Sequence, residues 1–173
     1  DRPDSKFLTV IVEEVDRLNH VVSQFLDFSK PQAKEFSEVE IGSLVEKTLE
    51  ILRSTTPIEI RLHKDIDTAR ILSAPGQIQQ IVVNLVQNAL QILSSSLPEG
   101  RTPLITVELA RESRLGGRRE IVLSVEDNGP GIKKDMIDQV FIPFVSRRPG
   151  GTGLGLSICQ KLVEDHQGRI EVE

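Results

Sequence analysis

The sequence has little of several features that define whole classes of protein. Its 173 residues include one cysteine, Cys159, which excludes a disulfide within the chain and fits a reducing, cytoplasmic setting. The net charge of −5 indicates no basic surface for nucleic acid. No apolar run approaches the roughly 20 residues that a helix needs to cross a bilayer, and the first residues show no signal-peptide pattern. We therefore expect a soluble segment without membrane contact, which is compatible with a membrane-anchored parent protein.

An apolar stripe with coiled-coil spacing runs through the first thirty residues. Pro31 disfavours helical geometry just before it, so this helix is expected to end near Ser29. One helix cannot bury its own stripe, and we therefore predict self-association as a homodimer. The stripe, at alternating steps of three and four, consists of Leu8, Ile11, Val15, Leu18, Val22 and Phe25.

Beyond residue 34, strand and helix patterns alternate. Apolar periodicity predicts strands over residues 36–40, 58–62, 69–72, 105–110, 121–126 and from 169 to 173, and helices over 41–53, 75–93 and 154–165. Gly116-Gly117 is the expected tip of a hairpin, and residues 128–150 read as a loop region with room for one short helix. This order predicts an α/β two-layer sandwich, with helices on one face of a mixed sheet, after the N-terminal coiled-coil-type helix.

Two asparagines lie on one face of the long helix predicted from residue 75. Asn84 and Asn88 are four residues apart, which places their amides about one turn from each other. Two neutral amides that point into a concave site can hold a metal ion and phosphate oxygens without adding negative charge. An isolated pair would also suit capping or surface positions, so this signal needs others beside it.

The strand over residues 121–126 is followed directly by Asp-Asn-Gly-Pro-Gly-Ile at residues 127–132. An aspartate at a strand end can accept a hydrogen bond from an exocyclic amine such as that of adenine. Glycines remove Cβ atoms where a flat ring must approach the backbone. A tight turn would use the same residue types, and the run by itself does not separate the two readings.

A glycine-rich run, Gly-Gly-Thr-Gly-Leu-Gly-Leu at residues 150–156, opens the last predicted helix. Backbone N–H groups and the helix dipole at such a start favour phosphate. The run is neither a P-loop nor a dinucleotide fingerprint, because it lacks Gly-Lys-Ser/Thr and no strand immediately precedes it. His-Arg-Asp and Asp-Phe-Gly are also missing from the chain, which excludes the eukaryotic type of protein kinase.

Taken together and in chain order, these motifs resemble the boxes that define the histidine kinase catalytic domain. The paired asparagines resemble the N box, residues 127–132 the first glycine box, Phe-Ile-Pro-Phe at 141–144 the F box, and residues 151–156 the second glycine box. The resemblance covers the chain from residue 35 to its end. It implies the Bergerat ATP-binding fold, of the superfamily shared with gyrase, the mismatch-repair ATPase and the large heat-shock chaperone, with ATP and Mg²⁺ as ligands.

The resemblance also implies roles for individual residues. Asn88 resembles the magnesium ligand, Asn84 a catalytic partner on the phosphate side, and Asp127 the adenine-recognising aspartate. Residues 141–148 resemble a mobile lid, in which Arg147 and Arg148 are candidates for the γ-phosphate contact; a solvated basic pair is the alternative. The other candidates for nucleotide binding are Gln91, Gly129, Gly131, Ile132, Phe144, Ser146, Gly151, Thr152, Gly153, Leu154, Gly155 and Leu156.

Position 84 separates transferases from hydrolases within this superfamily. The hydrolytic members carry a glutamate four residues before the metal-binding asparagine, as general base for water, and this chain carries Asn84 there. An amide cannot take a proton from water at neutral pH. The site therefore suits transfer of the γ-phosphoryl to another nucleophile, which needs mainly positioning and charge neutralisation. A hydrolytic ATPase is disfavoured for the same reason.

The first helix resembles the second helix of the dimerisation and phosphoacceptor domain, through Asp-Arg-Leu at 16–18 and Phe-Leu-Asp-Phe-Ser-Lys-Pro at 25–31. This implies a partial dimerisation helix over 1–31 and an ATP-binding catalytic domain over 32–173, whose last strand is cut short. The family's acceptor histidine lies on the preceding helix in a His-Glu/Asp context that His20 lacks. We expect this chain to bind nucleotide without autophosphorylating.

The implied partners are the chain's own or a partner's dimerisation domain, whose histidine is phosphorylated, and a response-regulator receiver domain, whose aspartate accepts the phosphoryl group next. The alternative is a non-hydrolytic Bergerat-fold binding module or an anti-sigma-type serine kinase. The coiled-coil stripe argues against that alternative, because such proteins do not need a helix bundle.

Overall fold

The computed structural model describes residues 7, 8, 11, 12, 15, 22, 35–66, 69–113, 117, 119–146 and 151–172. The six residues before 35 are helical, and their apolar side chains are exposed. The elements that follow are β1 (Ser37–Glu40), α2 (Ile41–Arg53), β2 (Glu59–Asp65), β3 (Arg70–Ser73), α3 (Pro75–Ser96), β4 (Leu104–Ser113), β5 (Arg119–Asp127), α4 (Lys134–Ile137) and α5 (Gly155–Asp165).

The described strands form two sheets. A three-stranded mixed sheet has the order β2-β4-β5, in which β2 runs parallel to β4 and β4 antiparallel to β5. The β4–β5 hairpin turns where it was predicted, and Gly117 at its tip has a φ of 76°, in the region that favours glycine. Strands β1 and β3 pair antiparallel as a separate two-stranded sheet.

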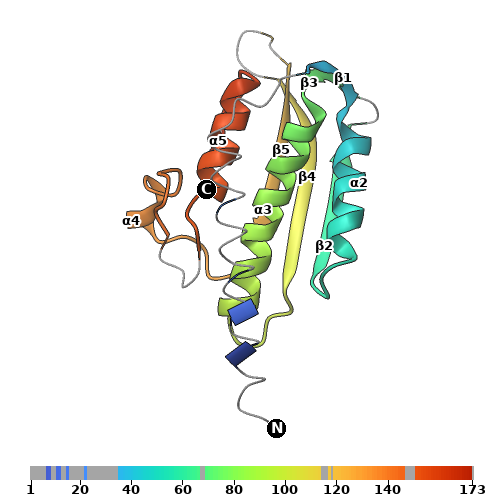
Figure 1. The fold of residues 1–173 in the computed structure, drawn as a ribbon. Helices are drawn as coiled ribbons and strands as arrows, with labels where there is room; N and C mark the ends of the chain where they lie inside the picture. The colour runs from blue at the N-terminus through green and yellow to red at the C-terminus, as the bar shows by residue number, and fades with distance from the viewer. Residues whose placement is uncertain are drawn as a thin grey trace.

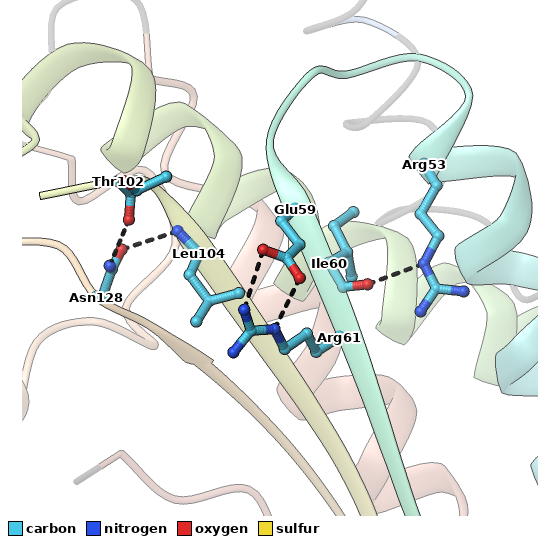
Figure 2. A network of polar contacts seen from close by, with 7 residues as sticks. All are labelled: Arg53, Glu59, Ile60, Arg61, Thr102, Leu104 and Asn128. Carbon is cyan, nitrogen blue, oxygen red and sulfur yellow. Dashed lines mark hydrogen bonds and ion pairs between the residues drawn. The ribbon is translucent and has the colours of Figure 1, made fainter.

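Three helices lie on one face of the larger sheet, with α3 between α2 and α5 (Figure 1). Pro75 occupies the first turn of α3, where its fixed φ and missing N–H are tolerated. Arg53, at the end of α2, donates from Nε to the Ile60 carbonyl of β2 at 2.9 Å, as Figure 2 shows. The predicted two-layer sandwich of a mixed sheet and helices is confirmed.

Two apolar clusters hold the layers together. The larger lies between α2, α3 and the sheet, and includes the fully buried Val45, Leu49 and Val86. The smaller lies between α3 and α5, and consists of Ile81, Leu154, Ile158, Cys159 and Leu162. Cys159 is a free thiol and is fully buried in this smaller cluster.

The predicted strand from residue 169 to 173 is wrong for the residues that the structure describes there. Residues 168–172 have no regular structure and do not pair with a strand. Arg169 instead forms ion pairs with Glu120 and Glu171, at 3.9 and 3.0 Å. An alternating pattern indicates which side chains suit a strand, but a strand also needs a neighbour to bond with.

Most of the predicted N-terminal helix lies outside the described residues, including Leu18, His20 and Phe25. Among the residues that the structure does describe, no helix combines the length and apolar character needed to span a membrane.

Candidate nucleotide-binding site

The two asparagines of α3 face the first turn of α5. Asn84 directs its Nδ2 to the Gly155 carbonyl oxygen at 3.5 Å. A Cβ atom built on Gly155 would lie 3.5 Å from Nδ2 of Asn88 and 3.7 Å from its Oδ1. The structure therefore brings these asparagines beside the second glycine run, and their binding of nucleotide stays a prediction.

Asp127 ends β5 and closes the turn that follows it. Its Oδ1 accepts from the Gly129 backbone N–H at 2.9 Å. A Cβ atom at Gly129 would lie 2.6 Å from that Oδ1 and 2.8 Å from Cγ2 of Ile92 on α3, so no other residue fits there without displacing Asp127. Gly131 has a φ of 75° and open space around it. This turn therefore requires glycine at two positions for two different reasons.

A stripe on α3 joins the two glycine-rich segments. Asn84, Asn88 and Ile92 follow one another at intervals of four residues and therefore lie on one face of the helix. Asn88 contacts the Gly155 turn, and Ile92 contacts the Gly129 turn, one helical turn further on. The segment expected to bind phosphate and the segment expected to bind the base are thus held about one turn apart on one surface.

Asn128 fixes the Asp127 turn to the sheet, a role that the sequence did not reveal. Its Oδ1 accepts from the Leu104 N–H at 3.0 Å, and its Nδ2 donates to the Thr102 carbonyl at 2.8 Å (Figure 2). Arg101 donates to the Asn128 carbonyl at 3.0 Å. An asparagine in a turn indicates local bonding, but these partners lie 24 to 27 residues away in the chain.

Phe144, within the predicted lid, meets Gly153 of the second glycine run. The Phe144 N–H donates to the Gly153 carbonyl at 3.0 Å, and both residues have positive φ, 65° and 66°. A Cβ atom at Gly153 would lie 2.6 Å from the Phe144 carbonyl carbon, a backbone contact that cannot yield. The side chain of Phe144 is 62% exposed. The described part of the predicted lid is thus joined to the second glycine run through a backbone contact that depends on a glycine.

The start of α5 is anchored in the apolar core, and no side chain caps its N-terminus. Leu154 is fully buried in the smaller cluster, and its N–H donates to Thr152 Oγ1 at 3.3 Å. No side chain caps the α5 N-terminus. Backbone N–H groups at such a terminus, together with the helix dipole, favour an anion.

Other predicted site residues stand as follows. Gln91, Ile132, Ser146 and Gly151 have exposed positions, and Leu156 is half-buried on α5. Arg147 and Arg148 lie outside the described residues, so their contact to the γ-phosphate stays a prediction.

Comparison with known proteins agrees with this geometry. Residues 73–173 match the family model described as histidine kinase-, DNA gyrase B-, and HSP90-like ATPase. The chain is 36% identical over 171 residues to the sensory histidine kinase/phosphatase NtrB of Escherichia coli O157:H7, covering 96% of this chain and 48% of that protein. The chain spans about half the length of the curated relatives it matches.

Solved structures give the same result. The histidine kinase ThkA in complex with the response regulator protein TrrA aligns with a TM-score of 0.74 at 27% identity, covering 97% of this chain and 47% of that chain. The nucleotide-free catalytic domain of ThkA aligns with a TM-score of 0.62 at 27% identity, covering 76% of this chain and 81% of that chain.

The fold and the glycine-flanked stripe on α3 define a nucleotide-binding sandwich, and the chain belongs to the histidine kinase-, DNA gyrase B-, and HSP90-like ATPase family. Within that family it is homologous to the sensor histidine kinases, whose ATP-binding catalytic domain its fold reproduces. The identification made from the four sequence boxes is confirmed.

Proposed function

We propose that this chain binds Mg-ATP and transfers the γ-phosphoryl group to a histidine of a dimerisation domain, for relay to an aspartate on a response regulator. The imidazole nitrogen forms the new bond to phosphorus, and the bond to the bridging oxygen breaks to release ADP. The names of NtrB and ThkA as histidine kinases, and the complex of ThkA with a response regulator, support the proposal.

The stripe of Asn84, Asn88 and Ile92 is the observation that carries this proposal. It places a pair of neutral amides beside Gly155 and an apolar side chain beside Gly129, in the order that a triphosphate and a base would require. At Gly129 the turn approaches α3 so closely that an added Cβ would lie 2.8 Å from Cγ2 of Ile92.

The donor set on α3 fits magnesium. Protein sites for this ion supply one or two oxygen ligands and leave the rest to water and substrate phosphates. The Asn88 amide would be the protein ligand, next to the phosphate-side glycines. When bound, magnesium would neutralise charge on the phosphates. Asn84 provides no base for water, because an amide has no basic site at neutral pH.

Residues 1–31 form, in this proposal, a partial dimerisation helix, and residues 32–173 the catalytic domain. The exposed apolar residues Phe7, Ile11 and Val15 support a homodimer through that helix. Arg147 and Arg148 would contact the γ-phosphate from the lid. The alternative of an anti-sigma-type serine kinase or a non-hydrolytic binding module is not favoured, because the relatives are named sensor histidine kinases.

The test is calorimetric titration of ADP and a non-hydrolysable ATP analogue, with and without magnesium. Asp127→Asn should weaken binding at least about tenfold, because the amide donor would face the adenine amine and leave a buried group without a partner. Asp65→Asn, at the exposed end of β2, is the control and should bind like the unsubstituted chain. Absence of any adenine-nucleotide binding by the folded chain would contradict the proposal.

A further inference from the structure

We infer that Asn128 is a positioning residue that makes the site select adenine over guanine, because its side chain holds the turn that presents the Asp127 carboxylate. This inference rests on the proposed function, in which Asp127 recognises the base. It deepens that function by giving a role to the residue between Asp127 and Gly129. It also adds the loop between α3 and β4 as a support for the base side of the site.

Asn128 lies where the β4–β5 ladder ends. The last pair of residues in that ladder is Ile105 and Asp127. One step further, the Asn128 N–H donates to the Leu104 carbonyl at 3.2 Å, as one half of an antiparallel pair. The return bond is different, because the Leu104 N–H donates at 3.0 Å to Oδ1 of the Asn128 side chain. The side chain thus takes the place that the Asn128 backbone carbonyl would hold in a regular ladder.

This exchange of acceptors lets the chain leave the sheet without losing a hydrogen bond. The Asn128 backbone carbonyl accepts instead from Arg101 Nη1 at 3.0 Å. The side-chain Nδ2 donates to the Thr102 carbonyl at 2.8 Å, as Figure 2 shows. All four polar groups of Asn128 are therefore bonded to residues 101–104, which makes this residue a support for the turn and not a contact to the nucleotide.

The support acts on Asp127 through the next residue. Gly129 follows Asn128 directly, and its N–H donates to Asp127 Oδ1 at 2.9 Å. That bond holds one carboxylate oxygen within the protein and leaves Oδ2 as the oxygen offered to a base. The position of the Gly129 N–H depends on the direction in which the chain leaves Asn128. Loss of the Asn128 amide would therefore free the carboxylate to turn.

A carboxylate with one oxygen held in this way favours adenine. The base-pairing edge of adenine offers one donor group, the exocyclic amine, which a single oxygen can accept. Guanine offers a ring N–H beside its exocyclic amine, a pair of donors that matches both oxygens of a carboxylate that turns freely. To form both bonds in the folded site, guanine would have to displace the Gly129 N–H from Asp127 Oδ1, whereas adenine would not.

The first measurement is the affinity for ADP and for GDP, each with magnesium, by calorimetry, beside the melting temperature without nucleotide. Asn128→Ala should weaken ADP binding about five- to tenfold, the range expected for a lost hydrogen bond to the base, and change GDP binding by less than about twofold. The preference for ADP therefore narrows. Asn128→Asp keeps the acceptor for the Leu104 N–H but has no donor for the Thr102 carbonyl, so its loss should be intermediate.

Arg53→Met is the matched control. It removes a side-chain hydrogen bond to a backbone carbonyl, that of Ile60, at the opposite edge of the same sheet (Figure 2). It should lower the melting temperature and leave the ratio of ADP to GDP affinity unchanged. Should Asn128→Ala not fold, Arg101→Met, which removes the exposed bond to the Asn128 carbonyl, should narrow the same ratio by about twofold.

Hydrogen exchange tests the mechanism without ligand. The Gly129 amide should exchange faster with solvent in Asn128→Ala than in the unsubstituted chain, and at nearly the unsubstituted rate in Arg53→Met, because only the first variant loosens the bond to Asp127. A folded Asn128→Ala variant with an unchanged affinity ratio, or with unchanged exchange at Gly129, would overturn the inference while leaving the proposed function intact. Failure of the unsubstituted chain to bind ADP would overturn both.

Discussion

Gly129 lies where the site leaves no room for a side chain. Its N–H bonds to the Asp127 carboxylate, and its missing Cβ is what lets the turn approach Ile92 on α3. The aspartate and the helix therefore constrain each other through a residue that contributes no side chain. A side chain at position 129 should therefore displace the Asp127 carboxylate, which we propose recognises the base, without changing its chemistry.

We expect Gly129→Ala to weaken ADP binding by about tenfold or more, because the new methyl group would lie 2.6 Å from Asp127 Oδ1 and displace it. Gly76→Ala is the matched control: Gly76 is in the first turn of α3, and a Cβ there meets nothing within 4 Å. That substitution should leave ADP affinity unchanged. Calorimetry on both variants checks the pair, and equal affinities would show that the turn does not position the carboxylate.

At the scale of elements, α2 shows how one side chain sets a helix start. Glu40 accepts from the N–H groups of Gly42 at 3.1 Å and Ser43 at 2.8 Å, which satisfies two donors that the helix itself cannot use. Hydrogen bonds from the Ser43 side chain and then from its backbone lower the pKa of Glu40 below its ordinary value of 4.5. The ionised form therefore stabilises the folded chain.

A lowered pKa in the folded state means that this stabilisation is present at pH values above the unfolded pKa and is lost as the pH falls through the folded one. Glu40→Gln should reduce the free energy of unfolding by no more than about 1 kcal/mol at pH 7, and the difference should shrink toward zero in acid. Urea unfolding at pH 7 and pH 3 measures it. Glu50→Gln, on an exposed position of α2, should show no such pH-dependent difference.

The elements that sequence reasoning located well are those with local signals. The predicted bounds of α2, residues 41–53, match the structure, and α3 begins at Pro75 as expected. The apolar spacing of each helix and the proline in the first turn are enough to place them. The paired amides, the Asp127 turn and the glycines of α5 were likewise recognisable from short runs of sequence.

What could not be read from the sequence depends on partners far along the chain. The parallel pairing of β2 with β4 joins Glu59 to Leu104, across the whole of α3, and no local pattern encodes it. The contact of Asn84 with the Gly155 carbonyl exists only because α5 packs on α3. The strand expected after residue 168 was wrong because alternation cannot supply a pairing neighbour.

At the scale of the whole molecule, the described residues of the N-terminal stripe take no part in the core of the catalytic domain. Every buried residue of the larger core lies at position 41 or beyond. Phe7, Leu8 and Ile11, by contrast, are 71%, 62% and 56% exposed, which leaves an apolar surface without cover from the residues that the structure describes.

Deleting residues 1–34 should therefore abolish self-association and leave the affinity for ADP within about twofold of the full chain. Light scattering over a range of concentrations, with calorimetry on the same samples, checks both halves of this expectation. A full-length chain that stays monomeric at high concentration, or a shortened chain that still dimerises, would contradict the role given to the stripe.

The division into two apolar clusters affects the conformation of the protein when no nucleotide is bound. Helix α5 is held to α3 by the smaller cluster, while α2 and the sheet are held by the larger, and partly buried Ile78 packs against both. Detachment of α5 would thus be a local opening that costs less than global unfolding. A molecule in that state keeps its sheet, but Gly155 no longer lies beside Asn88. It would be folded but unable to bind a triphosphate in the way proposed. Nucleotide would bind the form in which α5 is packed on α3 and would raise the population of that form by mass action. Nucleotide binding would therefore stabilise the position of α5.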